Sequence, residues 1–188
     1  MNKIIGILGM QGAIAEHQKI LLQIPHTKTR IVKTAKDLDC IDGLILPGGE
    51  STAIGKLLDY FSLKEILRQK IISGLPVFGT CAGLILLAKN IENQTNTHLA
   101  TMDITVKRNG YGSQLDSFST NLLIPTIDKN MPIPLVFIRA PYITKTDKDV
   151  QILATLDNKI IAARQKNMLV STFHTELTCD LRFHQYFL

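Results

Sequence analysis

Short apolar runs alternate with stretches of helical periodicity over the first half of the chain. Residues 4–8 and 43–46 are almost continuous apolar runs, which is typical of strands buried on both faces of a parallel sheet. Residues 13–22 and 54–72 carry apolar positions near helical spacing, and the second stretch predicts one long or broken helix. Residues 29–32 could form a short second strand. This alternation predicts an α/β fold of three layers, with a mostly parallel central sheet and helices on both faces.

The pattern changes after about residue 100, where short strand-like runs are separated by polar or proline-containing turns. The second half is therefore expected to add antiparallel strands. Thr178 is a candidate cap for a final helix that contains Leu181 and Tyr186. Because no repeat, linker or low-complexity tract interrupts the chain, we expect one domain over residues 1–188. The expected strands of this half are 102–106, 118–124, 135–138, 150–155, 160–163 and 169–172.

The apolar run at residues 76–78 ends in Gly79-Thr80-Cys81-Ala82-Gly83, and another apolar run follows at once. This is the layout of a nucleophile elbow, in which a strand turns sharply into a helix and presents one side chain at the apex. Glycines on both sides suit a strained turn that leaves no room for a Cβ. At a helix N-terminus, Cys81 would also be favoured as a thiolate. The alternative is a buried structural cysteine.

Composition narrows the functional classes. Of the 188 residues, 45% are hydrophobic and 20% charged, which is ordinary for a globular protein. The cysteines, Cys40, Cys81 and Cys179, form no C-x-x-C pair, so neither a zinc site nor a disulfide framework is indicated. The net charge of +5 is scattered rather than clustered, which argues against nucleic-acid binding. With no signal peptide or transmembrane run in the sequence, we expect a reduced cytoplasmic setting and no membrane contact.

A nucleophilic cysteine needs a base, and the base needs an orienting partner. Of the five histidines, His174 has the most suggestive context, because it follows a late apolar strand at the edge where α/β folds place functional residues. In an extended chain, positions i and i+2 project to the same side, so Glu176 can accept the far ring N–H of His174. The order Cys81, His174, Glu176 thus forms a candidate triad. The alternative for the pair alone is an unremarkable surface loop.

The segment Pro47-Gly48-Gly49-Glu50-Ser51-Thr52 follows the buried strand at residues 43–46. Two glycines there can expose backbone N–H groups, so we assign Gly49 N–H, with Ala82 N–H after the nucleophile, to an oxyanion hole. A phosphate-binding P-loop is excluded, because the spacing from Gly49 to Gly55 is wrong and Leu57 stands where Ser or Thr would bind magnesium. A plain glycine-rich turn with a helix cap at Ser51 or Thr52 is the alternative.

These motifs resemble those of class I (triad-type) glutamine amidotransferases, and more narrowly those of the glutaminase subunits of pyridoxal 5′-phosphate synthase. The resemblance spans essentially the whole chain in the right order. The elbow is shared by many amidotransferases, whereas several further segments make the narrower match. These segments are Gly9-Met10-Gln11-Gly12-Ala13 with Glu16-His17, Arg108-Asn109-Gly110-Tyr111-Gly112-Ser113-Gln114, Asp116-Ser117-Phe118, and Phe137-Ile138-Arg139-Ala140-Pro141.

The resemblance implies hydrolysis of L-glutamine to glutamate and ammonia, with the ammonia passed to a synthase subunit that builds pyridoxal 5′-phosphate. Cys81 would attack the carboxamide, His174 would move protons, and Glu176 would orient His174. No metal or bound cofactor is expected. Whether Arg108 or Arg139 meets the substrate carboxylate stays open. The implied substrate-binding residues are Gly49, Glu50, Ser51, Arg108, Ile138 and Arg139.

Two positions depart from the usual pattern of that family. Ser113 stands where an arginine is common, so any contact of that guanidinium is in doubt. Thr175 replaces the proline of a His-Pro-Glu-Leu motif, which removes rigidity from the turn. Neither change removes a triad member, and we expect an active enzyme. The family resemblance also implies that the chain alone is a poor glutaminase, until a synthase subunit docks near Gln11 and orients the peptide near Gly48 and Gly49.

Three alternatives remain for the function. Another amidotransferase, such as the glutaminase subunit that feeds imidazole glycerol phosphate synthesis, would share the triad. A cysteine peptidase would share the nucleophile but would not release ammonia from free glutamine. A binding module that only docks on a synthase would be indifferent to replacement of Cys81.

Overall fold

The computed structural model describes residues 2–108, 110 and 117–188, in which strands and helices alternate through the first half of the chain. The strands are β1 (Lys3–Leu8), β2 (Thr27–Val32), β3 (Gly43–Leu46), β4 (Val77–Thr80), β5 (Ala88–Ile91), β6 (Met102–Lys107), β7 (Ser117–Leu122), β8 (Ile133–Ile138), β9 (Tyr142–Thr146), β10 (Gln151–Leu156), β11 (Lys159–Gln165) and β12 (Met168–Ser171). The α-helices are α1 (Ile14–Leu21), α2 (Ser51–Tyr60), α3 (Lys64–Ile72), α4 (Ala82–Leu87) and α5 (Arg182–Phe187), and the 3₁₀ helices are η1 (Ala35–Cys40) and η2 (Thr175–Leu177).

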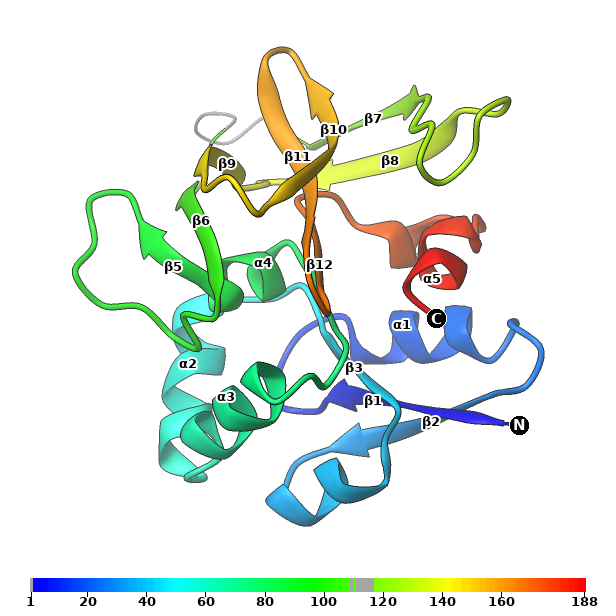
Figure 1. The fold of residues 1–188 in the computed structure, drawn as a ribbon. Helices are drawn as coiled ribbons and strands as arrows, with labels where there is room; N and C mark the ends of the chain where they lie inside the picture. The colour runs from blue at the N-terminus through cyan, green and yellow to red at the C-terminus, as the bar shows by residue number, and fades with distance from the viewer. Residues whose placement is uncertain (1, 109, 111–116) are drawn as a thin grey trace.

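The described strands form one large sheet in the order β2-β1-β3-β4-β12-β11-β9-β6-β5, with β10 paired to β11, and a separate hairpin of β7 and β8 (Figure 1). Strands β2, β1, β3, β4 and β12 pair in parallel. From β12 onward, β11, β10, β9 and β6 join through antiparallel pairings. The predicted α/β fold, with a mostly parallel central sheet and antiparallel strands added by the second half, is confirmed.

Helices cover both faces of the parallel part of the sheet. On β3, Leu44 and Leu46 pack with helices α2, α3 and α4, whereas Ile45 between them packs with α1 and α5 on the other face. Successive strand residues point to opposite faces, so a strand that is covered on both sides needs an unbroken apolar run. Figure 1 shows α1 and α5 together on one side and α2 and α3 on the other.

The apolar stretch at 54–72 is a broken helix. Helix α2 ends at Tyr60 and α3 begins at Lys64. Between them Ser62 has a left-handed backbone with φ of 52°, and the Leu63 N–H donates to Leu58 O. The prediction that left one long or one broken helix open is therefore resolved by a tight turn at Ser62.

Two details of the second half differ from expectation. Thr178 does not cap the final helix: its hydroxyl donates to Thr175 O, and the N–H of Arg182 at the start of α5 donates to Asp180 instead. Strands β5 and β9 were also not anticipated. Their sequences, Ala-Lys-Asn-Ile and Tyr-Ile-Thr-Lys-Thr, are short and half polar, and β5 follows α4 with no turn between them.

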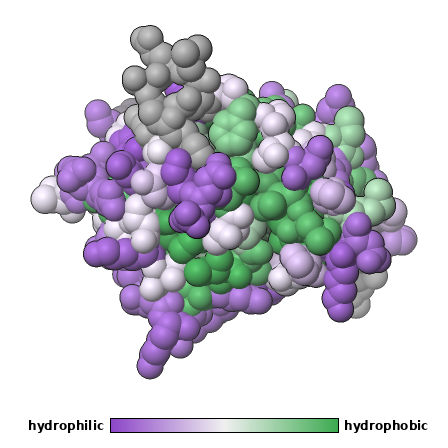
Figure 2. Space-filling view, turned by 90° about the horizontal axis from the view of Figure 1, so that it is seen from above, coloured by the Kyte–Doolittle hydropathy of each residue, from purple (hydrophilic) through white to green (hydrophobic). Residues whose placement is uncertain are grey.

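Figure 2 shows the molecule from above the view of Figure 1, with hydrophobic residues gathered in the middle of this face and hydrophilic residues around them. None of the helices in the described ranges combines the length and apolar character needed to cross a membrane.

Candidate active site

Cys81 lies at the turn between β4 and α4 and has a left-handed backbone with φ of 49°. A Cβ on Gly79 would lie 2.6 Å from the carbonyl of Gly83, and a Cβ on Gly83 would lie 2.1 Å from Leu46 O. Both glycines are thus required by close backbone contacts. The Cys81 N–H donates to Ser171 O, which ties the turn to β12. The strained, strand-to-helix geometry expected of a nucleophile elbow is present.

His174 follows β12, and its Nδ1 lies 2.6 Å from Glu176 Oε1. The His174 N–H donates to Val136 O of β8, which fixes the start of the loop. Residues 175–177 form the 3₁₀ helix η2 rather than extended chain. The expected pairing is therefore present, but a helical turn brings the two side chains together instead of the alternation of a strand.

The pKa values of this pair diverge. Burial alone would lower the pKa of His174, but its interactions with the Cys81 side chain and the Glu176 carboxylate raise it to about 10. Burial likewise tends to raise the pKa of Glu176, yet its electrostatic interactions with His17 and His174 and the hydrogen bond to His174 hold it below its usual range. At neutral pH the pair is therefore an imidazolium and a carboxylate.

The Gly48-Gly49 segment lies between the triad and the N-terminal loop. A Cβ on Gly48 would come within 2.5 Å of His174 Cε1, and one on Gly49 within 2.6 Å of Gln11 Oε1. Gln11 Oε1 also accepts a hydrogen bond of 2.8 Å from the Glu50 N–H. The alternative of a helix cap at Ser51 or Thr52 does not hold, because the cap of α2 is Glu50, whose side chain accepts from the Thr52 N–H. The N-terminal loop therefore holds the peptide that we assigned to the oxyanion hole.

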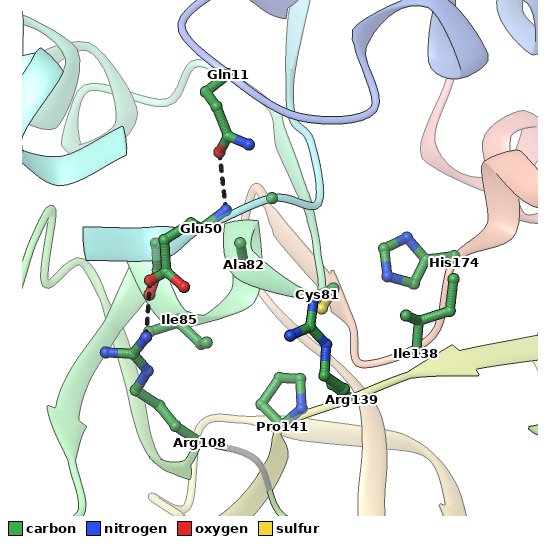
Figure 3. Close-up of a pocket in the computed structure, with 12 residues that line it drawn as sticks. Gln11, Glu50, Cys81, Ala82, Ile85, Arg108, Ile138, Arg139, Pro141 and His174 are labelled. Carbon is green, nitrogen blue, oxygen red and sulfur yellow. Dashed lines mark hydrogen bonds and ion pairs between the residues drawn. The ribbon is translucent and has the colours of Figure 1, made fainter. Parts of the chain in front are cut away.

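A cavity of about 380 Å³ opens beside Cys81 (Figure 3). Its wall brings together every residue predicted for substrate binding or the oxyanion hole, together with Cys81 and His174. Glu176 lies behind His174 and does not reach the cavity. Sequence reasoning had not assigned Ile85 and Pro141 to it, although Ile85 lies one helical turn after Cys81. The lining residues are Gln11, Gly49, Glu50, Ser51, Cys81, Ala82, Ile85, Arg108, Ile138, Arg139, Pro141 and His174.

Two arginines give the cavity a cationic side. Arg108 Nη2 lies 2.8 Å from Glu50 Oε1 (Figure 3). Arg139 follows β8 with a left-handed φ of 43°. Hydrogen bonds from Thr52, assisted by Arg108, lower the pKa of Glu50. A carboxylate and two guanidinium groups around one cavity match an amino-acid ligand, whose ammonium and carboxylate need opposite charges. Asn109 and residues 111–116 of the motif after Arg108, with the departure at Ser113, lie outside the described residues.

His17 was missed as a site residue, although the sequence placed it on the apolar face of the helix at 13–22. It is fully buried, and its Nε2 lies 3.5 Å from Glu176 Oε2. A histidine among apolar helix positions was the available signal. In the described ranges, no cluster of three or more His, Cys, Asp or Glu side chains is arranged to hold a metal ion.

Comparison with known protein families decides the assignment, because the model of the SNO glutamine amidotransferase family matches residues 7–188. The chain belongs to the SNO glutamine amidotransferase family.

Curated relatives of this SNO amidotransferase share more than half of its residues. A protein of Carboxydothermus hydrogenoformans named pyridoxal 5′-phosphate synthase subunit PdxT is 55% identical over 184 residues, 98% of this chain and 95% of that protein. The PdxT of Streptococcus pneumoniae strain CGSP14 is 52% identical, with 98% and 95% covered. A solved structure described as a glutamine amidotransferase has a TM-score of 0.90 at 38% identity and covers 98% of this chain and 96% of its own.

Proposed function

We propose that this chain is the glutaminase subunit of a pyridoxal 5′-phosphate synthase, hydrolysing L-glutamine through Cys81, His174 and Glu176. The observation that carries the proposal is the His174–Glu176 pair of 2.6 Å next to a cysteine on a strained elbow, in a chain of the SNO amidotransferase family. The PdxT relatives at 52–55% identity support the choice of synthase among the enzymes that glutaminases serve. We include in the proposal a single domain over the whole chain and a cytoplasmic location.

The chemistry begins with attack of the Cys81 thiolate on the carboxamide carbon of glutamine. The N–H groups of Gly49 and Ala82 donate hydrogen bonds to the oxygen that becomes negative, and His174 donates its proton to the nitrogen as the C–N bond breaks. Ammonia leaves and a thioester of Cys81 remains. His174, now neutral, takes a proton from water, which attacks the thioester and releases glutamate and the thiolate. Glu176 stabilises the imidazolium in both halves of the reaction.

Substrate recognition follows from the charges around the cavity. The ammonium group of glutamine is matched by Glu50, and its carboxylate by Arg108 or Arg139. The Glu50–Arg108 ion pair occupies these groups while no substrate is bound. Binding of glutamine therefore replaces the Glu50–Arg108 pair by two pairs, one at the ammonium and one at the carboxylate of the substrate. Ser51 and Ile138 form part of the remaining wall.

A synthase subunit is the proposed partner, and the N-terminal loop is where it would act. Gln11 contacts Gly49 and accepts from the Glu50 N–H, so a displacement of Gln11 changes the orientation of the oxyanion-hole peptide. Loss of one oxyanion donor costs roughly 10²–10³-fold in turnover. We therefore expect partner activation of that order.

The test is ammonia release from L-glutamine by the chain alone and with a pyridoxal 5′-phosphate synthase subunit. Release that rises with the partner and disappears in Cys81→Ala supports the proposal. Cys179→Ala is the matched control, because Cys179 is exposed. Equal release in the parent and Cys81→Ala contradicts the role of Cys81. Absence of release in both conditions favours a docking module.

A further inference from the structure

A second histidine lies buried directly behind the triad. His17 Nε2 is 3.1 Å from Thr80 Oγ1 and 3.5 Å from Glu176 Oε2. Its other ring nitrogen, Nδ1, is 3.0 Å from Nε2 of His184, which is also fully buried. Helix α1 supplies His17, α5 supplies His184, and the two helices lie together on one face of the sheet (Figure 1). The mechanism proposed above uses neither histidine.

Glu176 needs a partner for its second oxygen. Its side chain has no exposed surface, and Oε1 is engaged by His174. Oε2 is buried and has no hydrogen bond within the described part of the chain. A buried carboxylate without compensation is costly, and removal from water makes each remaining interaction stronger. The ring of His17 is placed to give that compensation.

The position of the protons follows from the ring contacts. Burial, with His17 nearby, lowers the pKa of His184 to about 3, so His184 is neutral at physiological pH. If neutral His17 carried its hydrogen on Nδ1, the lone pair of Nε2 would face the Glu176 carboxylate. If the Nε2–H of His184 donates to His17 Nδ1, the Nε2–H of His17 points at Thr80 and Glu176. The second arrangement satisfies both contacts.

We propose that His17 is a positioning residue for the reaction: its Nε2–H keeps Glu176 ionised and aimed at His174. The hydroxyl of Thr80, which precedes Cys81, contacts the same nitrogen of His17. This contact fixes the position of α1 relative to the elbow. The inference rests on the proposed function in that Cys81 and His174 are taken as the reacting pair. His17 acts through Glu176 and touches no substrate.

The surroundings of His17 contain few other charges. Burial lowers the pKa of His17, and the nearby charge of His174 lowers it further, while Glu176 and Glu16 act in the opposite direction. Among described side chains these groups, with His184, are the titratable ones that bear on the ring. Phe78 of β4 packs edge-on against the rings of both His17 and His184.

The test compares His17→Gln with His17→Asn, because the amide of Gln can replace Nε2 and that of Asn can replace Nδ1. Both are made in a chain carrying Cys40→Ser and Cys179→Ser, so that iodoacetamide reports on Cys81 alone. The rate of alkylation against pH gives the midpoint at which the thiolate is lost. This readout needs no glutamine. Phe78→Leu is the matched control, since it loosens the same core without removing a polar group.

We expect His17→Asn to raise the midpoint by about one pH unit, because a polar donor 3.5 Å from a buried carboxylate is lost. Without the donor, the pKa of Glu176 rises, so Glu176 takes up a proton at a higher pH, His174 loses its counter-charge and the thiolate is lost earlier. His17→Gln should keep the parent midpoint, and Phe78→Leu should lower stability without moving it. In ammonia release with the synthase subunit, His17→Asn should lower kcat with KM unchanged.

A parent-like midpoint in His17→Asn, or an equal shift in Phe78→Leu, overturns the proposal. If the Asn variant fails to fold, His184→Leu is the second test. It removes the donor to His17 Nδ1, which is the contact that keeps the hydrogen of His17 on Nε2. An upward shift there supports the proposal and an unmoved midpoint overturns it. A shift in alkylation together with no ammonia release from the parent would refute the proposed function but leave the positioning role of His17 standing.

Discussion

The two sides of His174 each carry a carboxylate, one partly exposed to water and the other fully buried. Towards the cavity, the Glu50–Arg108 pair leaves 55% of the Glu50 side chain and 22% of the Arg108 side chain exposed. Behind the ring, the side chains of Glu176 and His17 have no exposed surface at all. The two acidic groups that serve one site therefore have very different environments.

This difference separates binding from positioning. An exposed ion pair is screened by water and is worth at most about 1 kcal/mol, so substrate groups can replace it cheaply. Buried charges interact more strongly but are costly to leave unpaired, so each is held by several partners. Glu50 and Arg108, the front of the site, can exchange their partners on every turnover. Glu176 and His17, the back of the site, must keep one arrangement.

The largest effect is expected at the back of the site. Glu176→Gln keeps the size of the side chain but removes the charge that stabilises the His174 imidazolium. We expect kcat, measured with the synthase subunit, to fall by about 10²–10⁴-fold, with a smaller change in KM. Glu65→Gln, the same exchange at an exposed residue of α3, should leave kcat unchanged.

The pH profile of Glu176→Gln sharpens this prediction. The pKa of His174 is raised to about 10, so its proton is held until the pH rises through that value. Loss of the carboxylate lowers this pKa, and the alkaline limb of kcat should move to lower pH. A reduced kcat with an unmoved alkaline limb would show that Glu176 acts by packing rather than by charge.

Much of the site could be predicted because short sequence segments determine its backbone geometry. The glycines around Cys81 are needed because a Cβ on either one would lie 2.6 or 2.1 Å from backbone atoms, and glycine is recognisable in any sequence. The apolar runs of β1, β3 and β4 are short and nearly continuous, as expected for strands buried on both faces of a parallel sheet. Cys81 and His174 then follow adjacent parallel strands, β4 and β12, so the fold class alone brings them to one edge.

The parts that could not be predicted depend on tertiary contacts. His17 meets Glu176 across 159 positions of sequence, and a buried histidine on a helix has no local pattern that names its partner. The His174–Glu176 pair was expected from strand alternation but is made by a 3₁₀ turn. Strands β5 and β9 are half polar, and their pairing with β6 at one end of the sheet defines them.

A smaller effect, on binding only, is expected at the front. Arg108→Gln removes a guanidinium from the cavity wall and should raise KM for glutamine by about 10- to 100-fold, with kcat within a few-fold of the parent. The midpoint of thermal unfolding should hardly change, because the lost ion pair is exposed. Steady-state kinetics and a melting curve measure both quantities.

Arg139→Gln is the companion variant, and Arg68→Gln is the control. Arg68 lies on α3 outside the cavity, where it pairs with Glu65 and donates from Nε to Leu99 O, so its loss should leave KM unchanged. A raised KM in Arg139→Gln alone would assign the substrate carboxylate to Arg139. A large fall in kcat for Arg108→Gln would contradict the separation between front and back.

The smallest effect on activity is expected at a partly exposed charge pair that does not line the cavity. Asp128 accepts from the N–H groups of Asn130 and Met131 and pairs with Arg182 of α5. The backbone N–H of Asn130, together with Arg182, lowers the pKa of Asp128 to about 2. A lowered pKa in the folded state stabilises the protein above the ordinary value of 3.8, and this stabilisation is lost as the pH falls towards 2.

Asp128→Asn should therefore lower the unfolding midpoint by no more than a few degrees at pH 7, and the difference should shrink between pH 4 and pH 2 as the parent loses the same charge. Asp157→Asn, in the exposed turn between β10 and β11, should change nothing. Because Asp128 does not line the cavity beside Cys81, glutamine hydrolysis should be unaffected. A fall in glutamine hydrolysis in Asp128→Asn as large as that in Glu176→Gln would mean that distance from the cavity does not separate the charges that matter for catalysis from those that do not.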